Sequence, residues 1–371
     1  MSEAPVVELF CELAAIPSPS RHERAVMDRC LGYLRDLGLE WSEDEPPAPG
    51  DEAGNVLVRL PATPGVEGTP LLFCSHVDTV PPTAPIEPVI RDGMIENAHD
   101  TILGGDNKAA VASMLEAIAI VVRENRRHAG IELLLTVQEE TGLTGAKAFD
   151  ASRLAARAGY VYDHADRIGR IVTRAPSQYT LEATITGRPA HSGIAPEDGR
   201  SAIVAAAKAI GEMSLGRVDA ETTANVGLIA GGVARNIVPA RCTLSAEARS
   251  LDHEHALRHA RSMLDTLAYA ANAHECELTT SVTLEYRAYR LKRADPVVAI
   301  ATRALAAGGF EVELIASGGG ADSHVFTAAG IPCANLCNGM RQIHTSDESI
   351  AVDDVVAMVA VTLALIEAAQ G

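Results

Sequence analysis

The sequence has few aromatic residues, no close cysteine pair and too few cationic residues to balance its carboxylates. Aromatic residues make up 4% of the 371 residues, and the formal net charge is −18. This charge argues against nucleic acid or an anionic membrane surface as a partner. The seven cysteines are scattered without a Cys-x-x-Cys pair. Such a pattern is typical of free thiols in a reducing cytoplasm.

The sequence also lacks the apolar segments of membrane and secreted proteins. No uninterrupted apolar run reaches the ~20 residues that a membrane-spanning helix needs. The first residues have no basic start followed by an apolar stretch, so no secretory signal is expected. We therefore expect a cytoplasmic protein without membrane contact. Apolar residues make up 47% of the chain, which is enough for real cores in two or three domains.

The order of apolar runs predicts two kinds of domain. Strand-like runs alternate with helical segments in the first 174 residues and again near the C-terminus. This predicts an α/β fold, a mixed and mostly parallel sheet with helices on both faces. Between these parts the order becomes β-α-β-β-α-β, which is typical of a ferredoxin-like α+β domain. We predict a discontinuous catalytic domain, residues 1–174 and 288–371, and an inserted lid domain, residues 175–287.

One stretch, Leu71–Asp78 (LLFCSHVD), is an apolar strand that ends in a histidine and an aspartate. In α/β proteins, ligands and catalytic groups collect at the carboxyl ends of such strands. His76 and Asp78 are two residues apart, so in extended backbone they point to the same side. A carboxylate beside an imidazole can hold the proton of one ring nitrogen and direct the other nitrogen at a metal. We therefore expect His76 to bind metal and Asp78 to orient it.

Acidic residues and a second histidine follow in similar places. Asp106 comes after two glycines at the start of a predicted helix, Glu139 and Glu140 end a strand, Asp163 ends the next strand, and His344 lies in a late polar loop. Together with the first histidine, these residues are a full ligand set for two divalent cations, which can activate water and polarise a carbonyl. One of the adjacent glutamates can bind metal while the other acts as general base.

Each feature alone has a plainer explanation. Asp106 could cap a helix, a Glu-Glu pair is common on solvated faces, and a His-x-Asp pair is often a surface feature. Ser20 with Glu23 predicts a capping box at the start of the second helix. The metal interpretation depends on all the ligand types falling in order at strand ends and helix starts.

The motifs together resemble a known family. The order His-x-Asp-Thr, Gly-Asp-Asn-Lys-Ala, Glu-Glu-x-Gly, Asp and a late His resembles the co-catalytic zinc exopeptidases of the aminoacylase and carboxypeptidase G family, and among them the peptidase T-like tripeptide aminopeptidases. The resemblance implies two divalent metal ions, zinc with cobalt or manganese as alternatives. It also implies a cis peptide bond between Asp106 and Asn107. The implied roles are His76 and Asp163 on one metal, Glu140 and His344 on the other, Asp106 between them, and Glu139 as general base.

The predicted lid carries motifs that resemble the same family. His191 lies in the stretch GRPAHSG, which resembles a loop whose histidine reaches the substrate carbonyl, often from the partner subunit of a dimer. Asn236 and Arg249 resemble substrate-binding residues, and a guanidinium suits the terminal carboxylate of a peptide. Gly319 and Asp322 belong to a glycine-rich turn that resembles one lining the pocket. The plainer alternative for the His191 loop is a strand-end turn, and for Asn236 and Arg249 it is a structural role in a strand. The alternative for the glycine-rich turn is a phosphate cradle, which would need a basic residue that is absent here.

Two further candidates are rejected. His255 and His259 lie one helical turn apart, but Ala256 stands where a zinc peptidase helix would carry its glutamate. Cys74 lies within an apolar strand and is expected to be core rather than a nucleophile.

The leading interpretation is therefore a two-metal exopeptidase that acts on short peptides, an aminopeptidase for tripeptides. Asp163 supports this choice, because within the resembling family an aspartate here goes with aminopeptidases and dipeptidases. One alternative is a deacylase of N-acyl amino acids or related small amides with the same fold. Another is a non-catalytic binding protein on a decayed scaffold, which the intact ligand set disfavours. The resemblance also implies a possible homodimer through the lid.

Overall fold

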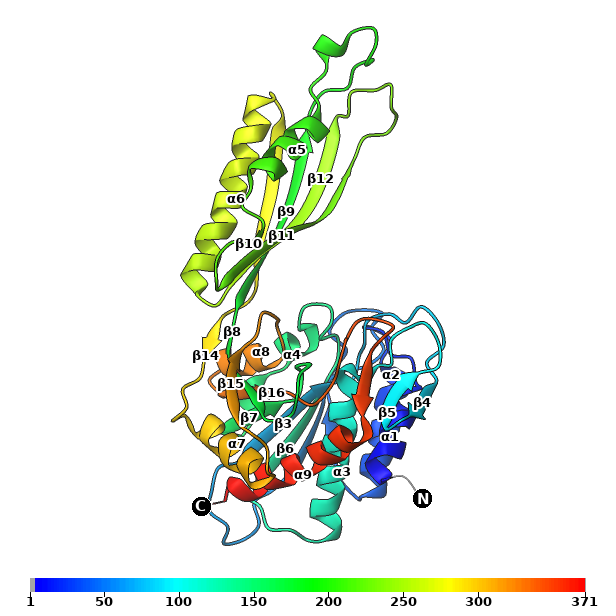
Figure 1. Ribbon diagram of the computed structural model, residues 1–371, viewed down its shortest axis with the longest axis vertical. Coiled ribbons are helices and arrows are strands. Elements are labelled where there is room, and N and C mark those ends of the chain that lie inside the picture. The colour runs from blue at the N-terminus through cyan, green and yellow to red at the C-terminus, as the bar shows by residue number, and fades with distance from the viewer. Residues whose placement is uncertain (1–3, 371) are drawn as a thin grey trace. The chain divides into compact units, whose positions relative to one another are not determined.

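The computed structural model describes residues 4–370, and the chain forms two compact units (Figure 1). Of the described residues, the first unit contains residues 4–173, the segment Arg290–Ala316 and residues 321–370. The second contains Arg174–Tyr289 and Ser317–Gly320.

The first unit is built on a nine-stranded mixed sheet, which confirms the predicted fold class. The strand order is β1-β2-β6-β3-β7-β16-β8-β14, with β15 paired to β8. The central strands β6, β3, β7 and β16 are parallel, whereas β1, β2 and β8 pair antiparallel to their neighbours. The strands are β1 Trp41–Glu43, β2 Val56–Leu60, β3 Leu71–His76, β6 Ile131–Thr136, β7 Ala158–Val161, β8 Arg170–Ala175, β14 Tyr289–Arg290, β15 Glu313–Ala316 and β16 Cys333–Leu336.

Helices cover both faces of this sheet because both faces of its central strands are apolar. Alternate residues of β3 point to opposite faces. Leu72 and Cys74 pack with Phe149 and Phe326 near α4 and α8, whereas Phe73 packs against Tyr160 and Tyr162. Hydrogen bonds tie these two tyrosines to residues of α7 and α9. The helices are α1 Pro5–Ala14, α2 Arg24–Asp36, α3 Gly105–Arg123, α4 Thr144–Ala148, α7 Pro296–Ala307, α8 Ser323–Ala328 and α9 Val352–Ala368.

Two smaller features complete the first unit. A three-stranded sheet has the order β17-β5-β4. Its strands are β4 Pro88–Arg91, β5 Met94–Asn97 and β17 Ser349–Ala351, and a single 3-10 turn, η1, spans Ala151–Arg153. Because β17 lies just after the late polar loop, its pairing with β5 fixes the end of that loop.

The second unit is an antiparallel sheet of order β10-β11-β12-β9-β13 with two helices packed on it. The chain order β9-α5-β11-β12-α6-β13 with this strand order is the ferredoxin-like arrangement. Alanines on α5 and α6 let the helices lie close to each other and to the sheet. The elements are β9 Ser177–Thr186, η2 Pro196–Asp198, α5 Ala202–Glu212, β10 Gly216–Arg217, β11 Thr222–Gly231, β12 Arg241–Ser250, α6 His253–Ala273 and β13 Glu277–Tyr286.

None of the helices between residues 4 and 370 combines the length and the apolar character needed to cross a membrane.

Candidate metal centre

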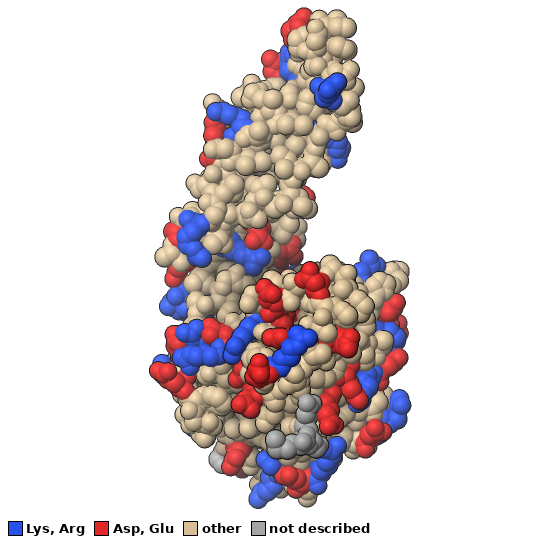
Figure 2. Space-filling view, turned by 45° about the vertical axis from the view of Figure 1, so that its right-hand side comes forward, with Lys and Arg blue, Asp and Glu red and all other residues tan. Residues whose placement is uncertain are grey.

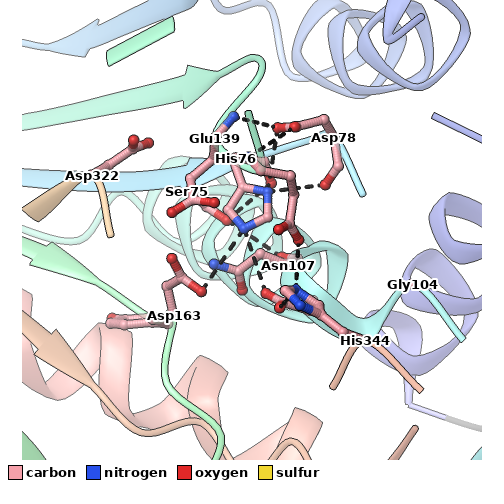
Figure 3. A network of polar contacts seen from close by, with 12 residues as sticks. Ser75, His76, Asp78, Gly104, Asn107, Glu139, Asp163, Asp322 and His344 are labelled. Carbon is pink, nitrogen blue, oxygen red and sulfur yellow. Dashed lines mark hydrogen bonds and ion pairs between the residues drawn. The ribbon is translucent and has the colours of Figure 1, made fainter. Parts of the chain in front are cut away.

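Three parallel neighbours of the first unit, β6, β3 and β7, bring predicted ligands to one edge of the sheet (Figure 3). His76 is the last residue of β3, Glu139 and Glu140 follow β6, and Asp163 follows β7. Since carboxyl ends of parallel strands meet at one edge, residues far apart in sequence come together there.

Asp106 reaches this cluster from the start of α3. Gly104 before it has a φ of 76°, and the peptide bond between Asp106 and Asn107 is cis, as the resemblance implied. Asp106 itself has non-helical angles (φ −82°, ψ 101°) and Gly104 is the residue that flanks the helix. The plain interpretation of Asp106 as a helix cap is therefore wrong, since its carboxylate faces imidazoles instead.

The carboxylate of Asp106 lies between two groups of ligands. Its Oδ1 is 3.5 Å from Nε2 of His76, and its Oδ2 is 3.2 Å from Nε2 of His344. On the first side, Oδ1 of Asp163 is 3.9 Å from the same nitrogen of His76. On the second side, Oε1 of Glu140 is 3.0 Å from Nε2 of His344. One carboxylate thus faces both groups, with one oxygen toward each.

The donor set fits divalent cations. Nε2 of His76 and Oδ1 of Asp106 are buried without any hydrogen-bond partner. Burying such atoms unpaired is costly, and coordination to a cation would remove that cost. In each of two sets, the three possible ligand atoms lie within 4.8 Å of one another. One set is His76, Asp106 and Glu140, and the other is His76, Glu139 and Asp163. Imidazole nitrogens mixed with carboxylate oxygens suit zinc and similar metals.

Asp78 contacts more of the cluster than His76 alone, which was the only contact that the sequence indicated. Its backbone carbonyl lies 2.9 Å from Nδ1 of His76, closer than its carboxylate at 3.4 Å. The carboxylate instead accepts the backbone N–H groups of Glu139 at 3.0 Å and Glu140 at 3.2 Å. It also accepts the hydroxyl of Ser20 at 2.7 Å, so the predicted capping box of Ser20 with Glu23 is wrong. Asp78 therefore holds both the histidine and the Glu-Glu segment.

Sequence reasoning missed a second supporting residue, Asn335. Its Oδ1 accepts the backbone N–H of Asp163 at 2.8 Å, and its Nδ2 donates to the carbonyl of Asp163 at 2.7 Å. Asn335 is buried on β16, next to β7. The sequence did contain a signal for this role, since Asn335 is the one polar side chain in the apolar run of β16. A buried amide needs hydrogen-bond partners, so its presence there indicates a polar contact.

The electrostatics of the cluster show a surplus of negative charge that protons offset. Burial raises the pKa of Glu139 well above its ordinary value, and the nearby Asp163 adds to this effect. Burial and the charge of Asp106 raise the pKa of Asp163 to about 7. Hydrogen bonds with Asp106 and Glu140 raise the pKa of His344 to about 10. Protons are therefore held where cations would otherwise balance the carboxylates.

We expect cation affinity to rise with pH between about 6 and 8. Below about 7 the carboxyl group of Asp163 keeps a proton that must leave before the group can bind a cation. Each proton that a cation must displace should weaken binding by up to ~10-fold for every pH unit below the pKa of the group that carries it. Titrating chelator-treated protein with Co²⁺ at pH 6, 7 and 8 measures the effect. A Co²⁺ affinity that stays constant over this range would contradict it.

Asp322, which the sequence predicted to bind substrate, lies at the start of α8. Asp322 is only 1% exposed and accepts the hydroxyl of Thr136 at 2.6 Å. Burial raises its pKa to about 6. It belongs to the first unit and adds to the negative field around Glu139. Its Oδ1 is buried without a hydrogen-bond partner, so a role in substrate binding stays a prediction.

His191 and Asn236 are brought together within the second unit. Both are exposed, and an isolated β-bridge pairs His191 with Ile237. The backbone N–H of Ser192 donates to the carbonyl of Asn236 at 3.0 Å. The His191 and Asn236 motifs, which the sequence indicated separately, therefore lie in two adjacent loops at the surface of the second unit.

Arg249, also in the second unit, already holds a carboxylate. Its Nε and Nη2 donate to the two oxygens of Glu247 at 3.0 and 2.9 Å, and its Nη1 donates to the carbonyl of Gly318 at 3.2 Å. The N–H of Gly319 donates to the hydroxyl of Ser317 at 3.0 Å. The forked edge of Arg249 that would suit a substrate carboxylate is thus occupied by Glu247.

The first unit's fold and this cluster define a class of protein, the metal-dependent hydrolases that assemble imidazoles and carboxylates at the strand ends of an α/β sheet. More particularly, the chain belongs to Peptidase family M20/M25/M40, whose profile matches residues 72–368. Members of this family depend on metal ions, and the chain is an enzyme that hydrolyses peptide bonds.

Similar proteins cover the whole chain. The uncharacterized protein YqjE of Bacillus subtilis (strain 168) is 39% identical over 370 residues, which span 100% of this chain and 99% of YqjE. The crystal structure of aminopeptidase PepT from Bacillus cereus has 40% identity and a TM-score of 0.88, and 98% of each chain is covered. A tripeptidase structure from Staphylococcus aureus has 34% identity and a TM-score of 0.92, with 98% of this chain and 97% of the tripeptidase covered.

Proposed function

We propose that the protein is a two-metal aminopeptidase that removes the N-terminal residue from short peptides, tripeptides above all, with zinc as the metal. The observation that carries this proposal is Asp106, whose two carboxylate oxygens face the two ligand groups. The likeness to an aminopeptidase and a tripeptidase over 97% or more of each chain supports the choice of substrate.

Each residue of the cluster has a proposed part. His76 and Asp163 would hold one cation and Glu140 and His344 the other, with Asp106 between the two groups. Bound divalent cations supply water activation and polarisation of the scissile carbonyl. Glu139 takes the proton of the attacking water and delivers it to the leaving amine. The raised pKa of its buried carboxyl group suits a base that must later give its proton back.

The proposed specificity rests on charge and on room beside Asp163. A free α-ammonium group is attracted to a carboxylate-rich cluster, and the short side chain of Asp163 leaves more space than a glutamate would. His191 would contact the substrate carbonyl, Asn236 would contact the peptide backbone, and Arg249 would hold the terminal carboxylate of a short peptide. Because Glu247 occupies the fork of Arg249, a substrate carboxylate would have to compete with it.

We further propose a homodimer formed through the second unit. Charged side chains are dense over the first unit in Figure 2 and sparser over the second. Ile194, Leu228 and Val233 of the second unit are 77%, 70% and 87% exposed. Exposed apolar side chains that form one continuous patch are typical of surfaces that bind another protein chain, and a dimer contact would remove these three from water. We also propose a cytoplasmic location, which suits the seven free cysteines.

We expect a free tripeptide to be cleaved and its N-acetylated form to resist cleavage. Acetylation removes the ammonium charge that the carboxylates attract and adds bulk beside Asp163. Liquid chromatography of matched pairs, such as Leu-Gly-Gly and N-acetyl-Leu-Gly-Gly, measures the difference, and we expect at least a ~100-fold ratio of kcat/KM, equivalent to ~2.7 kcal/mol. Rapid hydrolysis of N-acyl amino acids with no action on free tripeptides would replace this proposal with the deacylase alternative.

A further inference from the structure

A single buried carboxylate joins the two chain segments that carry Asp106 and His344. Oε2 of Glu348 accepts the backbone N–H groups of Leu103 at 2.8 Å and Gly104 at 2.9 Å. Its Oε1 accepts the backbone N–H of Asp106 at 2.9 Å. Glu348 is 3% exposed, and these partners lie more than 240 residues away in the sequence. Both oxygens are therefore fully engaged by one loop.

The loop before α3 is shaped to receive this carboxylate. The first N–H groups of a helix have no partner inside the helix, and here Glu348 accepts two of them, those of Gly104 and Asp106. A Cβ added to Gly105 would lie only 3.1 Å from Oε1 of Glu348, which leaves little room for a side chain there. Gly104 has a φ of 76°, which L side chains rarely adopt. The two glycines thus let the backbone close around Glu348.

Glu348 is itself fixed from both sides. Its N–H donates to the carbonyl of Thr345 at 3.2 Å, in the turn that follows His344. The next residues, Ser349–Ala351, form β17, which pairs with β5. The distance of 3.2 Å between Nε2 of His344 and Oδ2 of Asp106 therefore depends on two segments that Glu348 holds together.

We infer that Glu348 is a positioning residue for cation binding: its carboxylate fixes the Leu103–Asp106 backbone against the His344 loop, so that the Asp106 carboxylate can face both ligand groups. Residues that orient a metal ligand commonly change metal affinity by 10- to 100-fold when they are replaced. The inference rests on the cation site of the proposed function and adds a residue that does not itself bind the cation.

Two variants separate geometry from charge. Glu348→Gln keeps the length of the side chain, but its amide nitrogen cannot accept an N–H, so the loop loses an acceptor on one side. Glu348→Asp keeps the negative charge but is too short to reach the same three N–H groups. If positioning is the function of Glu348, both variants should weaken cation binding. If charge alone matters, the aspartate variant should bind like the unchanged protein.

Glu132 provides a matched control. It is 5% exposed and its Oε2 accepts the backbone N–H groups of Ala155 and Ala156, both at 2.9 Å. It lies near the amino end of β6, whereas Glu139 and Glu140 follow the carboxyl end of that strand. Glu132→Gln therefore disturbs a similar buried carboxylate at the other end of the strand from the ligands.

The test is a titration of chelator-treated full-length protein with Co²⁺, followed by visible absorption, together with thermal unfolding with and without Co²⁺. We expect the Co²⁺ dissociation constant to rise 10- to 100-fold in both Glu348 variants and less than ~3-fold in Glu132→Gln. The rise in melting temperature on adding Co²⁺ should shrink only in the Glu348 variants.

Three results would overturn the inference. Unchanged Co²⁺ affinity in both Glu348 variants would make Glu348 a purely structural residue. Full affinity in Glu348→Asp alone would assign its effect to charge. An equal loss in Glu132→Gln would show a general consequence of lost buried hydrogen bonds. Failure of the unchanged protein to bind Co²⁺ would instead refute the proposed cation site, so the two failures can be told apart.

Discussion

Replacing Asp106 with alanine is expected to abolish peptide hydrolysis and to lower the binding of both cations. Asp106 faces His76 with one oxygen and His344 with the other, so its removal takes a ligand from both groups at once. Bound cations would activate the water and polarise the carbonyl, which together lower the activation free energy by several kcal/mol. Turnover should therefore fall by at least ~10³-fold. Metal analysis of the purified variant and peptide hydrolysis assays measure the two effects together.

Asp347→Ala is the control for this experiment. Asp347 is exposed in the same loop as His344, and it belongs to neither of the two ligand sets. We expect it to keep both metal content and turnover near those of the unchanged protein. Full activity of Asp106→Ala, or activity of the unchanged protein after exhaustive chelation with no metal left, would contradict the two-metal account.

Glu139→Gln and Glu140→Gln should have opposite phenotypes although the residues are adjacent. Glutamine at 139 keeps the shape of the side chain but cannot take a proton, so turnover should fall by at least ~10²-fold while metal content stays near normal. Glutamine at 140 removes a carboxylate that lies 3.0 Å from Nε2 of His344, so it should weaken cation binding first. Kinetics at saturating Zn²⁺ and metal analysis after dialysis distinguish the two.

Each variant is a control for the other, because the backbone N–H groups of both residues donate to the carboxylate of Asp78. Proximity alone does not assign the base, since the carboxylate of Glu139 also lies within one set of possible ligand atoms. An exchange of the two phenotypes would show that Glu140 is the base and Glu139 the ligand.

The clustering of His76, Glu139, Glu140 and Asp163 was predictable from the sequence because it follows a local rule. His76, the Glu-Glu pair and Asp163 each come at or just after the end of an apolar strand, and parallel strands bring such ends together. The fold class was predictable for a similar reason, since buried parallel strands are apolar throughout. The cis bond after Asp106 came from family resemblance alone, because no local propensity of an Asp-Asn pair favours it.

Contacts between distant segments could not be predicted in this way. Nothing local to Glu348 indicates that it meets a loop more than 240 residues earlier. Ser20 looked like a helix cap, but its hydroxyl bonds to Asp78 across 58 residues. Asp322 was expected to bind substrate, but the glycine-rich turn alone did not indicate that its carboxylate accepts the hydroxyl of Thr136, 186 residues earlier. Arg249 was expected to await a carboxylate, whereas Glu247, two residues earlier on the same strand, already supplies one.

The most direct test of the central claim is the identity of the first products from a tripeptide with three different residues. Protein loaded with Zn²⁺ is mixed with Leu-Ala-Phe, and the products formed at early times are separated by liquid chromatography and identified by mass spectrometry. An aminopeptidase that holds the free amine beside its carboxylate cluster should release leucine and Ala-Phe. Release of phenylalanine and Leu-Ala would contradict the account, because the enzyme would then cleave from the other end.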